Sequence, residues 1–165
     1  MKKERLSTLI IAIVAIGVAA FFYKRYHVPP VVDMPAIALT DLSGNKVSIQ
    51  SYSGHPLFIS FFATWCGPCI REMPELADLK EKLSDKKLQI VCISDESTDK
   101  LQRLQIEMGN ELIILHSETS LHDIGVYTYP TNYIFNAKGK KVYDKVNPDH
   151  WNDPTLVERI RTLLD

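Results

Sequence analysis

Two cysteines, Cys66 and Cys69, are separated only by Gly67 and Pro68. They follow an apolar run at residues 57–62 and precede a helical pattern over residues 70–83. A strand that leads into a helix here places the first sulfur at the helix N-terminus, where unpaired backbone N–H groups and the helix dipole favour a thiolate. A thiolate attacks disulfides, and a second cysteine one turn later can resolve the mixed disulfide. The spacing therefore predicts thiol–disulfide exchange.

Two other roles for this cysteine pair are disfavoured by the sequence. A purely structural disulfide would close a loop too small to constrain the unfolded chain much. A zinc site would usually need four ligands, and no second Cys-x-x-Cys or His-x-x-x-His follows. The third cysteine, Cys92, lies inside an apolar run and is predicted to be a buried packing residue. We therefore expect no metal site and no bound cofactor, with the dithiol itself as the redox group.

An apolar segment from Leu6 to Tyr23 contains 18 residues and no charge. As a helix it would be roughly 27 Å long, close to the ~30 Å hydrocarbon core of a bilayer. Residues 1–25 are therefore predicted to form a membrane anchor with one transmembrane helix. A signal peptide cleaved after residues 18–20 is the first alternative, and a buried core helix is the least favoured one, because the segment has no polar stripe. Basic residues flank both ends of the segment, so the positive-inside rule gives only a modest preference for a cytoplasmic N-terminus.

The formal net charge of −1 conceals an uneven distribution. Residues 1–25 hold five basic residues and one acidic residue, which leaves 14 basic and 19 acidic residues in the remaining chain. A domain with a net charge of −5 by this count is a poor candidate for binding nucleic acid. No nucleic-acid partner is expected.

The remaining chain divides into a proline-rich tether at residues 26–35 and one domain at residues 36–165. A hairpin is predicted from residues 36–40 and 46–50, and the last helix is predicted to begin with Asp153 as its N-cap. The other expected strands are 57–62, 88–94, 112–115, 131–135 and 141–146, and the expected helices are 70–83, 98–108, 120–127 and 154–164. The order predicts an α/β, thioredoxin-like fold with an N-terminal β-hairpin and a central αβ insertion. Its parallel part should carry helices on both faces.

The segment Phe61-Phe62-Ala63-Thr64-Trp65-Cys66-Gly67-Pro68-Cys69 resembles the active-site segment of the thioredoxin superfamily. Glu72-Met73-Pro74 and the hairpin before the motif resemble the membrane-tethered TlpA/ResA-like thiol–disulfide oxidoreductases of the AhpC/TSA-redoxin group. The resemblance covers about residues 33–165. It implies a protein-disulfide reductase of the bacterial inner membrane with a periplasmic or extracytoplasmic domain. The implied partners are cell-envelope proteins such as apocytochrome c and a DsbD/CcdA-type membrane electron donor. No dimerisation segment is evident, so a monomer is expected.

The resemblance also implies roles for individual residues. Cys66 matches the exposed nucleophile, Cys69 the buried resolving cysteine, and Glu72 a carboxylate that assists proton transfer. Thioredoxin carries a buried aspartate six residues before its first cysteine, where this chain has Ser60, so Glu72 is the natural substitute. A solvated helix residue is the alternative for Glu72.

Substrate binding is expected around a cis-proline, Pro130, that faces the cysteines. The resemblance places an extended substrate segment against the backbone of Tyr129. Ordinary packing is the alternative for the aromatic side chain beside the nucleophile. The full substrate-binding set is Trp65, Gly67, Pro68, Tyr129, Pro130 and Thr131.

Two rival functions follow from the same residues. A peroxiredoxin-like peroxidase places Thr three residues before the peroxidatic cysteine, whereas Thr64 lies two before Cys66. A non-enzymatic copper- or thiol-binding module would use a Cys-x-x-x-Cys pair, and the spacing here is one residue short. Gly67 and Pro68 match the reducing members of the superfamily, although direction depends on how far the reduced form is stabilised.

Overall fold

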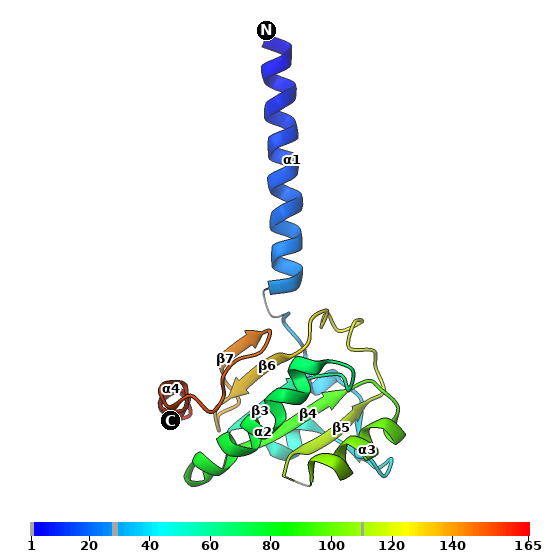
Figure 1. The fold of residues 1–165 in the computed structure, drawn as a ribbon, viewed down its shortest axis with the longest axis vertical. Helices are drawn as coiled ribbons and strands as arrows, with labels where there is room; N and C mark the ends of the chain where they lie inside the picture. Colours follow the sequence, from blue (N-terminus) through cyan, green and yellow to red (C-terminus); the bar gives the residue numbers. More distant parts are fainter. Residues whose placement is uncertain (1, 28–29, 110) are drawn as a thin grey trace.

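A computed structural model describes residues 2–27, 30–109 and 111–165. Met1 of the predicted anchor, Val28 and Pro29 of the predicted tether, and Asn110 beyond the second helix of the domain lie outside the described residues. Helix α1 (Lys2–His27) projects away from the folded domain (Figure 1). Its stretch Thr8–Tyr26 is long and apolar enough to cross a membrane by length and composition, and none of it is buried against the domain.

The domain is built on one seven-stranded sheet in the order β2-β1-β5-β4-β3-β6-β7. The central strands β3, β4 and β5 are parallel, as predicted from the alternating part of the chain. The flanking strands β1, β2, β6 and β7 pair antiparallel to their neighbours. The strands are β1 (Leu39–Thr40), β2 (Lys46–Val47), β3 (Leu57–Phe61), β4 (Gln89–Ser94), β5 (Ile113–Ser117), β6 (Thr131–Phe135) and β7 (Lys141–Val146).

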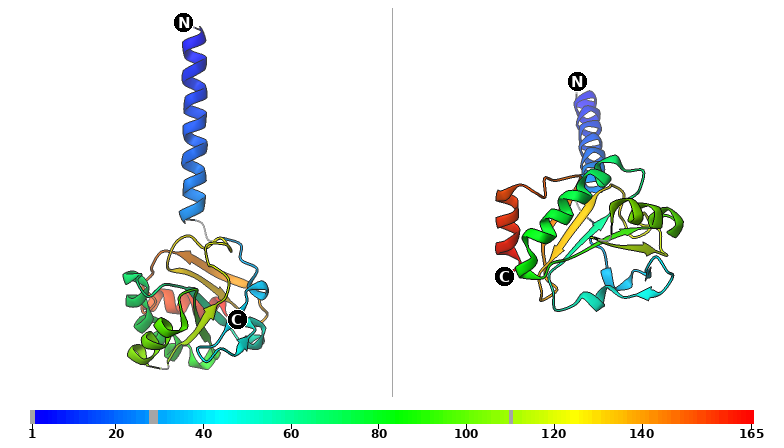
Figure 2. Two further views of the ribbon diagram at one scale, coloured as in Figure 1. Left: turned by 90° about the vertical axis from the view of Figure 1, so that its right-hand side faces the viewer. Right: turned by 60° about the horizontal axis from the view of Figure 1, so that its bottom comes forward.

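Three α-helices pack on one face of this sheet, in a single apolar cluster (Figure 2). They are α2 (Gly67–Lys82), α3 (Thr98–Met108) and α4 (Pro154–Leu163). The other face is covered by the 3-10 helices η1 (Met34–Ala36) and η2 (Ile49–Tyr52) and by side chains of the 121–126 turn. A third 3-10 helix, η3 (Ser84–Lys86), follows α2. The prediction of α-helices on both faces is therefore wrong for the described residues.

The missing helix is the one predicted over residues 120–127, which form turns instead. The N–H of Asp123 bonds the carbonyl of Ser120, and the N–H of Gly125 bonds the carbonyl of His122, so the bonds have 3-10 spacing. The N–H of Leu121 is taken by a side-chain oxygen of Asp95, 2.9 Å away. Gly125 then turns the chain with φ of +90°, a conformation that ends a right-handed helix.

The predicted N-terminal hairpin forms, but its strands are shorter than expected. Asp41 holds its turn by accepting the N–H groups of Ser43 and Asn45, each at 2.9 Å. Ser48 then accepts the N–H of Gln50 and caps η2, so the second predicted strand ends early and continues as a 3-10 helix. The other predicted strands and helices agree with the structure within a few residues. Asp153 caps α4 as predicted, since its carboxylate accepts the N–H of Leu156 at 3.0 Å.

Strand register places three polar side chains in one row across the sheet. Ser60 on β3 pairs with Cys92 on β4 and with Asn132 on β6. Residues in register share a face of the sheet, and Cys92 belongs to the cluster that packs under the helices. The row therefore lies beneath α2, on the side that carries the predicted chemistry.

Candidate active site

Cys66 and Cys69 lie where the loop after β3 enters α2. Cys66 is the N-cap of α2, and its Sγ accepts the N–H of Cys69 at 3.3 Å. The two cysteines form a disulfide with Cα atoms 5.3 Å apart. Gly67 is exposed and Pro68 occupies the first turn. The predicted placement of the dithiol at a helix N-terminus is thus confirmed.

The expected exposure of Cys66 is wrong for this oxidised form. Cys66 is 5% exposed, hardly more than Cys69 at 2%. In the disulfide, Sγ of Cys66 lies at the helix N-terminus and accepts the backbone N–H of Cys69. In the oxidised form the sulfur of Cys66 is therefore almost completely covered.

The loop before the dithiol is braced by Glu96, a residue that the sequence did not single out. The backbone N–H and the hydroxyl of Thr64 both donate to its carboxylate. Partial burial acts to raise the pKa of Glu96, but the hydrogen bonds from Thr64 and Lys100 outweigh it, so that pKa is lowered. Glu96 is therefore a charged carboxylate at neutral pH, and in this form it accepts the hydrogen bonds that hold the loop.

The predicted cis-proline is present: the Tyr129–Pro130 bond is cis. Trp65 is 72% exposed, and its ring meets the ring of Tyr129 edge-on with centroids 5.8 Å apart. Thr131 is buried and its hydroxyl donates to the carbonyl of Thr128 at 2.7 Å. Of the predicted substrate-binding residues, Trp65 and Gly67 are exposed and Pro68 and Tyr129 are half-buried, while Pro130 and Thr131 are buried.

Glu72 lies one helical turn after Cys69 and is only 3% exposed. Side chains three apart on a helix are neighbours, so its carboxyl group shares a face with Cys69. Its Oε1 accepts two hydrogen bonds of 2.8 Å, from the N–H of Asp149 and from the indole N–H of Trp151. The alternative that Glu72 is a solvated helix residue is therefore wrong.

Burial raises the pKa of Glu72, and the negative charge of Glu75 adds to the effect. The hydrogen bonds from Asp149 and Trp151 oppose it, as does the nearby amide of Asn132. Even so, neither Oε2 of Glu72 nor either amide atom of Asn132 completes a hydrogen bond among the described residues. A buried carboxyl group with a raised pKa and one free oxygen is suited to taking and returning a proton.

Asp149, Trp151 and Asn132 were not identified as site residues from the sequence. The first two are 77 and 79 residues from Glu72 and belong to the connection between β7 and α4. Contacts between residues so far apart in the sequence leave no pattern among neighbouring residues. Strand pairing alone brings Asn132 opposite Ser60.

Cys92 is fully buried, as predicted. Burial raises the pKa of its thiol to about 12, with a further contribution from the charge of Glu72. It is therefore a neutral thiol at physiological pH and a poor nucleophile. Among the described residues, no three His, Cys, Asp or Glu side chains are grouped so that they could hold a metal ion.

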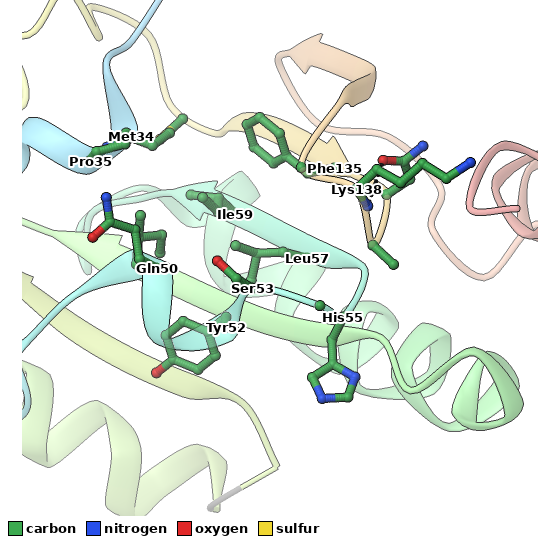
Figure 3. A pocket seen from close by; sticks show the side chains of 15 residues that line it. Met34, Pro35, Gln50, Tyr52, Ser53, His55, Leu57, Ile59, Phe135 and Lys138 are labelled. Atoms are coloured by element: carbon green, nitrogen blue, oxygen red, sulfur yellow. Dashed lines mark hydrogen bonds between the residues drawn. The ribbon is translucent and has the colours of Figure 1, made fainter.

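A separate pocket of about 310 Å³ lies on the opposite face of the sheet (Figure 3). Its walls come from η1, η2, β3 and the turn between β6 and β7, and they are apolar at the centre around Leu57 and Ile59. His55 and Lys138 stand at its edge in Figure 3. It contains none of the residues around the dithiol, so the chemistry lies elsewhere.

Comparison with known proteins gives consistent results. The sequence profile of the AhpC/TSA family matches residues 31–143. The chain is 27% identical over 162 residues to the thiol-disulfide oxidoreductase ResA of Bacillus thuringiensis, covering 87% of this chain and 89% of ResA. It is 33% identical over 110 residues to the thioredoxin-like protein YneN of Bacillus subtilis, covering 64% of each chain. A thiol:disulfide interchange protein of the thioredoxin family from Chlorobium tepidum superposes with a TM-score of 0.64 at 20% identity, covering 83% of this chain and 97% of that one. These matches confirm the predicted thioredoxin-like fold and the resemblance to ResA.

The raised pKa of Glu72 gives a prediction about stability. A carboxyl group whose pKa is raised by folding stabilises the fold while it is neutral, and this contribution is lost as the pH rises through the folded pKa. Glu72→Gln cannot ionise and keeps an oxygen for the donors of Asp149 and Trp151. The variant should therefore be more stable than the wild type at pH 7, with the difference vanishing in acid near the ordinary glutamate pKa of 4.5.

Urea unfolding of the oxidised protein at both pH values measures this difference. Glu81→Gln, at an exposed position of the same helix, is the matched control and should show no such pH-dependent gain. A wild type that is as stable as Glu72→Gln at pH 7 would show that the hydrogen bonds fully offset the burial of the charge.

Proposed function

We propose that this chain, which belongs to the AhpC/TSA family, uses Cys66 and Cys69 to reduce disulfides in proteins of the cell envelope. It is a thiol–disulfide oxidoreductase of the ResA kind, as its relatives and its fold indicate. The observation that carries the proposal is the disulfide at the N-terminus of α2, with a buried carboxyl group one turn further on.

The reaction starts from the reduced pair. The helix N-terminus stabilises Cys66 as a thiolate, which attacks one sulfur of a substrate disulfide. The substrate S–S bond breaks, one substrate thiolate leaves, and a mixed disulfide joins Cys66 to the substrate. Trp65 and Tyr129 form an aromatic surface beside Cys66 on which the substrate segment can lie.

The second step releases the substrate. Cys69 gives its proton to Glu72, and its thiolate attacks Sγ of Cys66. The mixed disulfide breaks, the second substrate thiolate leaves, and the Cys66–Cys69 disulfide forms. Two electrons have passed to the substrate, whose two sulfurs take up protons from Glu72 and from water. A dithiol donor must then reduce the protein again.

The peroxidase alternative has less support from the geometry. A peroxidase of this type would need a hydroxyl group directed at the attacking cysteine. The hydroxyl of Thr64 instead donates to Glu96, at 2.9 Å. The resolving cysteine one turn along the same helix favours disulfide exchange.

The position of α1 supports a membrane-anchored protein. The guanidinium of Arg25 lies 4.0 Å above the ring of Tyr127, and the hydroxyl of Tyr133 donates to the carbonyl of Pro30 at 2.8 Å. The end of α1 therefore lies beside the 125–133 segment, which includes Pro130 (Figure 1). We propose that residues 1–25 anchor a monomer in the bacterial inner membrane, with the dithiol on an extracytoplasmic edge close to the membrane. A DsbD/CcdA-type membrane carrier as donor and apocytochrome c as substrate fit this position.

The exchange reaction predicts different outcomes for the cysteines. Cys69→Ser should trap a mixed disulfide through Cys66, because the resolving thiol is gone, whereas Cys66→Ser should abolish disulfide reduction. Incubation of each reduced protein with a disulfide-bonded protein, followed by non-reducing electrophoresis and intact-mass measurement, detects the adduct.

Cys92→Ser is the matched control and should react like the wild type, because Cys92 is buried with a raised pKa. The proposed function fails if Cys66→Ser keeps its reductase activity. It also fails if the wild type consumes hydrogen peroxide but reduces no protein disulfide.

The anchor proposal predicts that the mature protein keeps residues 1–25. The full chain should stay in the membrane after an alkaline carbonate wash, and its mass should include the N-terminal segment. Ile13→Asp places a charge near the middle of α1, at a cost of about 2.5–3.5 kcal/mol at the membrane centre, and should release part of the protein. A soluble wild-type chain that begins after Ala20 would contradict the anchor and establish the signal peptide.

A further inference from the structure

One short segment, residues 147–151, contacts both halves of the active site. At its start, the N–H of Asn147 donates to the carbonyl of Pro130 at 2.9 Å. At its end, Asp149 and Trp151 both donate to Glu72, and the backbone N–H of Trp151 also donates to Glu75 at 2.9 Å. The segment therefore links the cis-proline loop to the helix that carries the dithiol.

The indole of Trp151 is held firmly in place. It is completely buried, and its ring meets Phe58 edge-on with centroids 4.8 Å apart. Tyr143 packs on it in the same manner, at 6.0 Å. Its N–H is consequently a donor of fixed position, and its partner Oε1 of Glu72 is 2.8 Å away.

The two donors act on one oxygen and leave the other free. Both the indole N–H and the N–H of Asp149 are bonded to Oε1 of Glu72, whereas Oε2 is buried and makes no hydrogen bond among the described residues. Two donors on one oxygen fix the rotation of the carboxyl group. An unpaired buried carboxylate oxygen is costly, so its retention indicates a function for that oxygen.

We propose that Trp151 is a positioning residue, whose indole N–H acts together with the N–H of Asp149 to hold Oε1 of Glu72 and leave Oε2 to accept the proton of Cys69. The inference rests on the proposed function, because it concerns the proton transfer in the second step. The tryptophan touches no reacting atom and acts only through Glu72.

A loss of the indole donor has a predictable direction. Hydrogen bonds to a carboxylate favour its charged form, so their removal raises the pKa of Glu72 further. The charged and titratable groups around Glu72 are Glu75 on α2, Cys92 on β4 and the dithiol itself. The carboxylate of Asp149 is engaged by the hydroxyl of Tyr143 and by Lys145. Of these, only the dithiol takes part in the reaction.

Trp151→Phe keeps an aromatic ring but removes the N–H. Disulfide reduction by the full-length variant should be about tenfold slower at pH 7, since a hydrogen bond to a charged group contributes at least this much. The acid limb of its pH–rate profile should move to higher pH by about one unit, which corresponds to the tenfold loss of rate at pH 7. The rate should therefore recover in alkaline buffer.

The double variant Trp151→Phe with Glu72→Gln separates positioning from packing. If Trp151 acts through Glu72, the second substitution should remove the effect of the first, and Trp151→Phe should change nothing in the Glu72→Gln background. Equal slowing in both backgrounds, without a shift of the pH profile, would show that Trp151 only packs. Phe58→Leu, which alters the packing of the indole but no donor, should leave the position of the acid limb unchanged.

If Trp151→Phe does not fold, the isosteric analogue benzothienylalanine at position 151 replaces the N–H with sulfur and should produce the same shift. A wild type that reduces no protein disulfide would overturn the proposed function itself. An active wild type with a slow Glu72→Gln variant and an unshifted position-151 variant would overturn only this inference.

Discussion

The structure depends on the burial of one carboxyl group, that of Glu72, beneath a dithiol. Removing a carboxylate from water is expensive unless hydrogen bonds replace the lost hydration. The chain supplies these bonds from a segment far along the sequence, through the N–H of Asp149 and the indole of Trp151. Only one oxygen is satisfied in this way, so the group keeps both a raised pKa and a free acceptor.

The sheet provides the surface against which this carboxyl group is buried. The proposed proton transfer would use a carboxyl group on the face of α2 that carries Cys69, and that face packs on the sheet over Ser60, Cys92 and Asn132. The strand that supplies Asn132 begins directly after the cis-proline. The cis-proline loop, the buried carboxyl group of Glu72 and the dithiol are therefore joined through one layer of the core. The loop before Cys66 is fixed separately by Glu96.

Local signals explain what the sequence could predict. The Cys-x-x-Cys after an apolar run indicated the strand, the helix start and the reaction, and family resemblance indicated Glu72 and the cis bond at Pro130. Most strands were predicted correctly because alternation and apolar runs are local properties. The prediction of a helix over residues 120–127 was wrong because the backbone bonds there have 3-10 spacing and because Gly125 turns the chain. The burial of Cys66 and the hydrogen bond from Trp151 to Glu72 depend on tertiary contacts, which no pattern of neighbouring residues encodes.

The most direct test of a reductase is the reduction potential of the Cys66–Cys69 pair in the intact protein. Equilibration with glutathione or dithiothreitol buffers, followed by thiol trapping, gives the value. A reductase that receives electrons from a membrane carrier should have a potential near that of thioredoxin, about −270 mV. A value near −120 mV, typical of a strong oxidant such as DsbA, would contradict the account, because the protein would then donate disulfides instead of reducing them.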